Sequence, residues 1–419
     1  MKIVHISNTD SGGALELHAA MLENGIDSSM IVAKHDLGYA GEIYKVGFVD
    51  KARSVTSNFI ATMLFNNLNE SRGMYSYPML GAKLSQHKLV LLADVIYLHF
   101  VAHSSFLSLK GIEQLLKLGK PVIFITRDMW PITGGCHYFR DCDNYITSCS
   151  ICPVFNNRKT IISYPGNQQK QKYSLYNKYN NLFFVGISSW NTDEIRRAKV
   201  TSKLTPITIH NCIDTNIFKP LSKVAARTML NLPLNDILVG FGARDINNPL
   251  KGGQFAKEAL KIISQKQEIK FKIVTFGRNQ GNSRMLENTE QFNLGQLMDR
   301  YSMALFYNAV DVYVNPTLAE AFGNTAAESL SCGVPVVGFK VGGLMDIVDH
   351  NVNGYLADVD DTKDLVDGIL KFIRLSNNLE IVKLCRRKAV DNYSRTVIFN
   401  KHMGLLKEIT EGMQQEKQL

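Results

Sequence analysis

Residues 314–328 read VNPTLAEAFGNTAAE, which is the pattern of a strand end, a loop and a helix start in succession. An apolar run over 310–314 predicts a buried strand, and a helix is expected to begin near Asn324. The backbone N–H groups of Gly323, Asn324 and Thr325 would then lie at a helix N-terminus, which attracts phosphate. The stretch therefore predicts an anion site where the strand ends.

Two carboxylates flank this predicted anion site, Glu320 in the loop and Glu328 in the early turns of the helix. A carboxylate accepts two hydrogen bonds from a vicinal diol, so one glutamate could hold a ribose and the other a sugar ring. A single acid near a helix start is more simply explained by the helix dipole. The pair, with Gly-Asn-Thr between its members, favours a ligand-binding site.

Short apolar runs alternate with helix-length amphipathic stretches along the whole chain, which is typical of βαβ units with a parallel sheet. Strands are expected at 3–6, 29–32, 95–99, 122–125, 182–185, 207–209, 237–241, 271–276, 310–314 and 335–339. The pattern breaks at a polar, Pro-containing linker, 218–222. We predict an α/β protein with two Rossmann-like, doubly wound domains (1–220 and 221–390) that face each other across a cleft. Residues 391–419 are expected to form a helix that returns to the first domain.

The composition excludes several classes of protein. A chain of 419 residues with 45% hydrophobic and 20% charged residues is neither disordered nor a single small domain. Seven cysteines are too few for a disulfide scaffold, and the first ten residues lack the pattern of a signal peptide, so a cytoplasmic location is expected. The apolar stretch 89–109 contains Asp94, His99 and His103, which argues against a membrane span. The net charge of +9, mostly from 1–220, suits an anionic partner or simply solubility.

Glu320 and Glu328 are separated by seven residues and resemble the E-x7-E signature of retaining glycosyltransferases of the GT-B fold, family 4. The likeness continues through SCGVPVV at 331–337, VGGLMDIV at 341–348, NGYL at 353–356 and NCIDTNIFKP at 211–220. In the first half, DVIYLHF at 94–100 and DMWPITGGCHY at 128–138 are similar to the subgroup that builds bacterial exopolysaccharides such as colanic acid and related O-antigens.

This resemblance implies a donor site and a mechanism. It implies that the donor is held by Gly12, Gly13, Arg244, Lys251, Phe322, Gly323, Asn324, Thr325 and Glu328. Glu328 would hold the ribose hydroxyls, and Glu320 would lie beside the transferred sugar. Cations and helix amides would stabilise the leaving diphosphate, so no metal or other cofactor is expected to be required for catalysis. Retention would follow from front-face attack on an oxocarbenium-like centre.

The acceptor side departs from the family at one position. Relatives usually carry histidine before Asp-Met-Trp, whereas this chain has Arg127 there, followed by Asp128. Arginine does not release its proton near neutral pH, so Arg127 binds the substrate electrostatically or a different group serves the acceptor. The catalytic candidates are thus Glu320, Arg127 and Asp128, with His99 and His137 on the acceptor side.

Four cysteines, Cys136, Cys142, Cys149 and Cys152, follow one another as C-x5-C-x6-C-x2-C. The last two have metal-ligand spacing, and a structural zinc takes four such ligands, with His137 as a fifth candidate. The whole pattern fits no standard zinc finger, so structural zinc and free buried thiols both remain open. A disulfide fits a reducing compartment least well.

Residues 51–88 mix cations with apolar side chains, a composition that suits either an anionic membrane surface or core packing. The resemblance favours the membrane, because many such enzymes act on polyprenyl-diphosphate-linked sugars at the cytoplasmic face. We therefore predict a glycosyltransferase of the hexosyltransferase type, peripheral on the inner face of the cytoplasmic membrane. It would move a sugar from a nucleotide sugar, UDP- rather than GDP-linked, to a lipid-linked glycan in bacterial surface polysaccharide and lipopolysaccharide biosynthesis.

Two other functions are compatible with parts of the sequence. A sugar-nucleotide epimerase shares the two-domain fold and would release a free sugar even when a glycan acceptor is present. A basic nucleic-acid-binding protein with a cysteine-metal knuckle would show steeply salt-dependent RNA or DNA affinity. The αβ alternation and the glutamate pair argue against nucleic acid as a partner.

Overall fold

The computed structural model describes residues 1–416 except 36–41, 66–67, 69–73, 157–162, 268, 279–284, 287 and 377. The chain forms two compact units, each with its own sheet. Unit 1 comprises Met1–His210 with Ile398–Leu419, and unit 2 comprises Asn211–Val397. Parts of the predicted membrane-contact stretch, including Arg72, lie outside the described residues.

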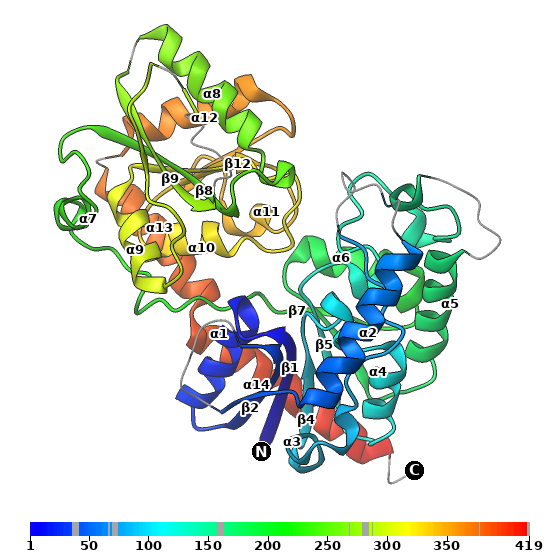
Figure 1. The fold of residues 1–419 in the computed structure, drawn as a ribbon. Helices are drawn as coiled ribbons and strands as arrows, with labels where there is room; N and C mark the ends of the chain where they lie inside the picture. Colours follow the sequence, from blue (N-terminus) through cyan, green and yellow to red (C-terminus); the bar gives the residue numbers. More distant parts are fainter. Residues whose placement is uncertain are drawn as a thin grey trace. The chain divides into compact units, whose positions relative to one another are not determined.

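Unit 1 is built on a seven-stranded parallel sheet in the order β3-β2-β1-β4-β5-β6-β7. Its strands are β1 (Lys2–Thr9), β2 (Asp27–Lys34), β3 (Ile43–Lys45), β4 (Val95–Leu98), β5 (Val122–Thr126), β6 (Leu182–Gly186) and β7 (Ile207–Thr208). Helices cover both faces (Figure 1): α1 (Gly12–Glu23), α2 (Phe48–Leu64), α3 (Lys88–Leu92), α4 (Leu109–Leu116), α5 (Tyr164–Tyr176), α6 (Ser189–Arg197) and α14 (Arg395–Glu416). Because both faces are covered, the central strands β4 and β5 are buried along their whole length.

Unit 2 has a six-stranded parallel sheet in the order β10-β9-β8-β11-β12-β13. The strands are β8 (Ile237–Asp245), β9 (Phe271–Arg278), β10 (Gln291–Asn293), β11 (Val312–Asn315), β12 (Val336–Phe339) and β13 (Gly354–Ala357). The helices are α7 (Lys223–Met229), α8 (Gly253–Lys266), α9 (Arg300–Ala309), α10 (Asn324–Ser331), α11 (Leu344–Ile347), α12 (Thr362–Arg374) and α13 (Leu379–Tyr393). The prediction of two doubly wound parallel α/β domains is confirmed.

The chain leaves unit 1 earlier than the polar linker at 218–222 suggests, because the residues from Asn211 onward already belong to unit 2. Ile213 pairs with Ser394, and the carbonyl of Phe218 accepts a hydrogen bond of 2.6 Å from Arg386. At the other end of the chain, α14 packs in unit 1, where His402 lies 3.2 Å from the hydroxyl of Tyr97.

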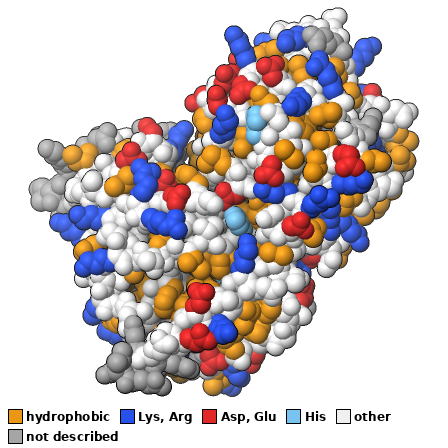
Figure 2. Space-filling model, turned by 180° about the vertical axis from the view of Figure 1, so that it is seen from behind, with side chains coloured by type: hydrophobic (Ala, Val, Ile, Leu, Met, Phe, Trp, Pro, Cys, Tyr) orange, Lys and Arg blue, Asp and Glu red, His pale blue; other side chains and the backbone are white. Residues whose placement is uncertain are grey.

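The surface carries charges of both signs. On the face seen in Figure 2, Lys and Arg side chains are interspersed with Asp and Glu side chains. Among the described residues, no helix combines the length and the apolar character needed to cross a bilayer.

Candidate functional site

The loop between β11 and α10 forms the core of the candidate donor site. Helix α10 begins at Asn324, as predicted, and Gly323 precedes it with a φ of 108°, in the left-handed region. A side chain at Gly323 would meet Leu344 at 3.0 Å, so glycine suits this position both sterically and conformationally. Gly323 has no side chain to cap the helix, and among the described residues no side-chain hydrogen bond to its first amides is seen, so these amides can bind an anion.

Lys251 and Glu320 are brought together from distant parts of the sequence. The Nζ of Lys251 donates a hydrogen bond of 2.9 Å to Oε2 of Glu320, and the two side chains are 34% and 20% exposed. A ligand can therefore reach this ion pair. The two opposite charges are adjacent, so the cation of Lys251 could bind an anionic part of a ligand and the carboxylate of Glu320 a polar part of the same ligand.

A close backbone contact fixes the position of Lys251. The next residue, Gly252, has a φ of 68°, and a Cβ there would lie 1.8 Å from the carbonyl oxygen of Pro316. In addition, the amide of Leu318 donates to the carbonyl of Leu250 at 2.9 Å. The turn that carries Lys251 is thus packed directly onto the loop that carries Glu320.

Glu328 is oriented by a tyrosine that the sequence did not suggest. The hydroxyl of Tyr307, on α9, donates to Oε2 of Glu328 at 3.0 Å. Burial raises the pKa of Tyr307 well above its usual value, and the charge of Glu328 raises it further. Tyr307 therefore remains a proton donor that orients the carboxylate of Glu328.

Two asparagines hold the polar side chains at the start of α10. Asn211 donates to the side-chain oxygen of Asn324 at 3.0 Å, and Asn315 lies 3.5 Å from the hydroxyl of Thr325. Phe322 is buried and packs against Tyr393. The side chains of Phe322, Asn324 and Thr325 thus contact other residues of unit 2, so a ligand at this loop would meet mainly its backbone.

Arg244 does not join this cluster. It is exposed near the end of β8, and within the described ranges the structure records no hydrogen bond or ion pair for it. Lys251 is paired with Glu320, and the expectation that Arg244 helps to hold the donor stays a prediction. In unit 1, Gly12 and Gly13 open α1 directly after β1, and Gly12 has a φ of 60°.

Arg127 is engaged with a predicted acceptor-side residue. Its Nε donates to Nδ1 of His99 at 3.0 Å, and Nε2 of His99 lies 2.9 Å from Nδ1 of His5. Because arginine can only donate, the proton of His99 must sit on Nε2. Burial lowers the pKa of His99 well below its usual value, and the charge of Arg127 adds to this effect. Arg127 thus fixes the tautomer of a neutral histidine.

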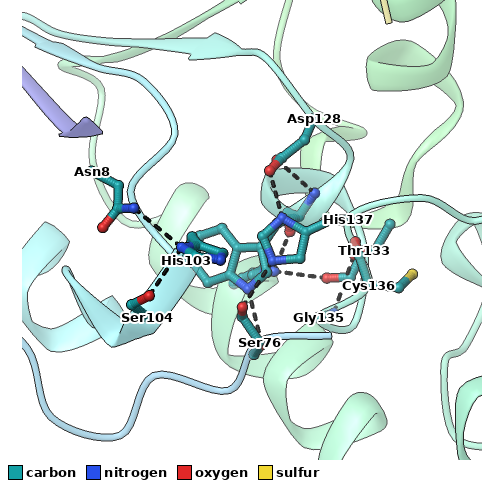
Figure 3. A network of polar contacts seen from close by, with 11 residues as sticks. Asn8, Ser76, His103, Ser104, Asp128, Thr133, Gly135, Cys136 and His137 are labelled. Atoms are coloured by element: carbon teal, nitrogen blue, oxygen red, sulfur yellow. Dashed lines mark hydrogen bonds and ion pairs between the residues drawn. The ribbon is translucent and has the colours of Figure 1, made fainter. Parts of the chain in front are cut away.

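Asp128 and His137 form a relay with a third residue, Ser76 (Figure 3). Oδ2 of Asp128 lies 2.5 Å from Nδ1 of His137, whose Nε2 lies 2.8 Å from the hydroxyl of Ser76. His137 is almost completely buried, whereas Ser76 is partly exposed. A substrate can therefore reach this relay through Ser76, a residue that sequence patterns did not single out.

A buried lysine, Lys172, binds the backbone of the loop that follows Asp128. Nζ of Lys172 donates to the carbonyls of Trp130 and Thr133, at 2.9 Å for Thr133, and lies 3.8 Å above the ring of Trp130. Burial lowers the pKa of Lys172 to about 7. Its environment therefore favours the neutral amine above that pH.

We expect Lys172→Met to lower the free energy of unfolding of unit 1 by about 2–4 kcal/mol at pH 9, because two buried carbonyls lose their donor. The difference in unfolding free energy between the wild type and Lys172→Met should be about 2 kcal/mol smaller at pH 7 than at pH 9. A folded pKa below the unfolded value means that the unfolded state binds more protons, so the wild type gains stability as pH rises from 7.

Denaturant titrations followed by tryptophan fluorescence measure this, because Trp130 and Trp190 both lie in unit 1. Lys170→Met, an exposed position on the same helix, is the matched control and should unfold like the wild type. An equal deficit at pH 7 and pH 9 would contradict a neutral buried amine.

The four clustered cysteines line one small cavity with Tyr75, Phe139 and Tyr145. They carry free thiols, and burial raises the pKa of Cys136 and of Cys149 to about 12. In the part of the chain that the structure describes, no three His, Cys, Asp or Glu side chains are arranged to hold a metal ion. Zinc binding by these cysteines therefore stays a prediction.

These features can be compared with known proteins. The chain has the GT-B fold: sucrose-phosphate synthase of Thermosynechococcus elongatus superposes with a TM-score of 0.64 at 15% identity, covering 98% of this chain and 100% of that one. HepE of Anabaena, in complex with UDP, superposes with a TM-score of 0.64 at 17% identity, covering 97% and 100%.

Residues 236–374, which lie in unit 2, match the family described as Glycosyl transferases group 1. D-inositol 3-phosphate glycosyltransferase of Thermobispora bispora is 31% identical over 165 residues, which are 36% of this chain and 38% of that protein. The alignment with this curated relative thus spans about two fifths of its length.

Proposed function

We propose that the protein is a retaining glycosyltransferase that needs no metal ion and uses a nucleotide-sugar donor bound by unit 2. One observation carries this proposal: the accessible ion pair of Lys251 and Glu320 beside the uncapped start of α10. A cation and free helix amides suit a diphosphate, and a carboxylate suits the sugar attached to it. The match of 236–374 to group 1 glycosyltransferases supports the same function.

The proposed mechanism assigns the chemistry to this cluster. As the bond between the sugar and the diphosphate breaks, negative charge grows on the leaving group, where Lys251 and the α10 amides stabilise it. Positive charge grows on the sugar, and the carboxylate of Glu320 stabilises this charge. The acceptor hydroxyl attacks the face of the sugar from which the diphosphate leaves, and the proton of the hydroxyl passes to the donor phosphate. Glu328 holds the ribose in both the ground state and the transition state.

UDP is the proposed nucleotide. Solved structures of HepE hold UDP, or UDP-glucose, and cover almost the whole of this chain. The inositol phosphate acceptor in the names of the curated relatives is not transferred here, because the alignments cover less than half of this chain. We propose instead a polyprenyl-diphosphate-linked glycan, in bacterial surface polysaccharide synthesis at the inner face of the cytoplasmic membrane. The likeness of 128–138 to the exopolysaccharide and O-antigen subgroup supports this choice.

A thermal-shift panel of nucleoside diphosphates tests the donor site. At 100 times its dissociation constant, UDP should stabilise the folded protein by about 2.7 kcal/mol, and GDP and ADP should do so less. Lys251→Ala should lose most of the UDP-induced shift, because the diphosphate loses its cation. Unchanged melting with every nucleoside diphosphate would refute the proposed donor site.

A further inference from the structure

Helix α2 exposes the side that a surface helix normally buries. Its exposed apolar side chains include Phe48, Val55, Phe59 and Met63, with exposed fractions of 85%, 60%, 63% and 65%. These positions are 7, 4 and 4 residues apart, so they form one stripe along the helix. A continuous apolar stripe faces solvent. Figure 1 shows α2 at the front of unit 1.

The opposite side of α2 is attached to the protein by polar contacts. The hydroxyl of Ser57, which is fully buried, accepts hydrogen bonds of 3.1 Å from the amides of Met79 and Leu80. Arg53 donates to the carbonyl of Gly81 at 2.9 Å. Asp50 accepts from the amide of Lys83, also at 2.9 Å. The helix is thus anchored through its polar side.

The neighbourhood of the stripe is cationic. The described residues 42–65 and 74–92 contain five lysines and arginines and two acids, Glu42 and Asp50. Lys45, Lys51 and Lys83 are exposed. An apolar helical stripe bordered by cations is the composition of a helix that lies in the surface of an anionic bilayer.

We propose that the stripe of Phe48, Val55, Phe59 and Met63 inserts into the headgroup region of an anionic lipid bilayer, with Lys45, Lys51 and Lys83 among the phosphates. This surface deepens the proposed function, on which it rests, because a lipid-linked acceptor would be met at that bilayer. The bound membrane thereby lies against unit 1, the unit that carries the acceptor-side residues.

The test is co-sedimentation with vesicles of phosphatidylcholine containing phosphatidylglycerol. The triple variant Val55→Glu, Phe59→Glu, Met63→Glu should bind at least about tenfold more weakly, because charged side chains replace apolar ones at the bilayer. The matched control is Val224→Glu, Met229→Glu, Leu234→Glu in unit 2, also at exposed apolar positions, which should bind like the wild type. Lys51→Gln should weaken binding roughly fivefold on these vesicles and not on pure phosphatidylcholine.

Depth of insertion gives a second readout. Phe59→Trp should show fluorescence quenching by brominated lipids beyond that of the wild type. Unimpaired binding of the triple variant, or no added quenching at position 59, would overturn the proposal. Self-association of the wild type through α2 without vesicle binding would also overturn it, in favour of a second copy as partner.

The UDP thermal shift separates this proposal from the proposed function. The triple variant should keep the full UDP-induced shift while losing vesicle binding, because the substitutions lie outside unit 2. Vesicle binding without any UDP response would refute the proposed donor site and leave the membrane surface intact.

Discussion

Glu320→Gln should lower kcat for donor turnover by about 10²–10³ while changing the donor KM less than about threefold. Positive charge develops on the sugar only as the glycosidic bond breaks, so a carboxylate beside it acts mainly in the transition state. Glutamine keeps an oxygen that can accept the hydrogen bond from Lys251, so the substitution removes the negative charge and preserves this hydrogen bond.

Steady-state donor titrations of Glu320→Gln separate kcat from KM. The matched control is Glu258→Gln on α8, an exposed glutamate of the same unit whose recorded contact is a hydrogen bond of 3.3 Å with Thr362. It undergoes the same change of charge and should keep wild-type kinetics. If Glu320→Gln retained full kcat, Glu320 would not be catalytic.

Glu328→Gln is expected to fail differently, by raising the donor KM about 10- to 150-fold with a smaller effect on kcat. Charge-assisted hydrogen bonds to the ribose are worth about 1.5–3 kcal/mol and are present in both the ground state and the transition state. The variant should fold normally, because the glutamine oxygen can still accept the hydrogen bond from Tyr307.

Tyr307→Phe provides a graded comparison for Glu328. It removes the hydroxyl that orients the carboxylate but leaves the charge, so the donor KM should rise less than in Glu328→Gln. The same titrations measure both variants. A fall in kcat at constant KM in Glu328→Gln would contradict a ribose-binding role.

The sequence predicted the sheets well at their centres and poorly at their edges. Each strand that it missed, Ile43–Lys45, Gln291–Asn293 and Gly354–Ala357, is an edge strand of three or four residues. Such strands are too short to show a period, and the partial exposure of Ile43–Lys45 and Gln291–Asn293 removes the continuous apolar run that marks a buried strand.

The residues of the candidate donor site could be predicted from the sequence, but the contacts between these residues could not. Glu320, Glu328 and Lys251 stand out because their spacing resembles a family pattern, yet the pairing of Lys251 with Glu320 depends on Gly252 packing against Pro316. No local sequence signal encodes a contact across 69 residues.

Two supporting residues were missed for a similar reason. Lys172 lies in the polar run NQQKQK, where a buried lysine cannot be distinguished from a solvated one. Tyr307 lies on an amphipathic helix, where an aromatic side chain is usually part of the core. Their roles depend on which polar atoms they meet in the fold, and the hydrophobic pattern carries no information about that.

Release of UDP from a panel of UDP-sugars, by the wild type and by Glu320→Gln, tests the central claim most directly. The proposed function predicts that at least one UDP-sugar is turned over, slowly to water and faster with a glycan acceptor. It also predicts that Glu320→Gln reduces the rate by about 10²–10³ at saturating donor. Equal UDP release by the wild type and Glu320→Gln, or conversion of the donor to a free epimerised sugar whether or not acceptor is present, would contradict it.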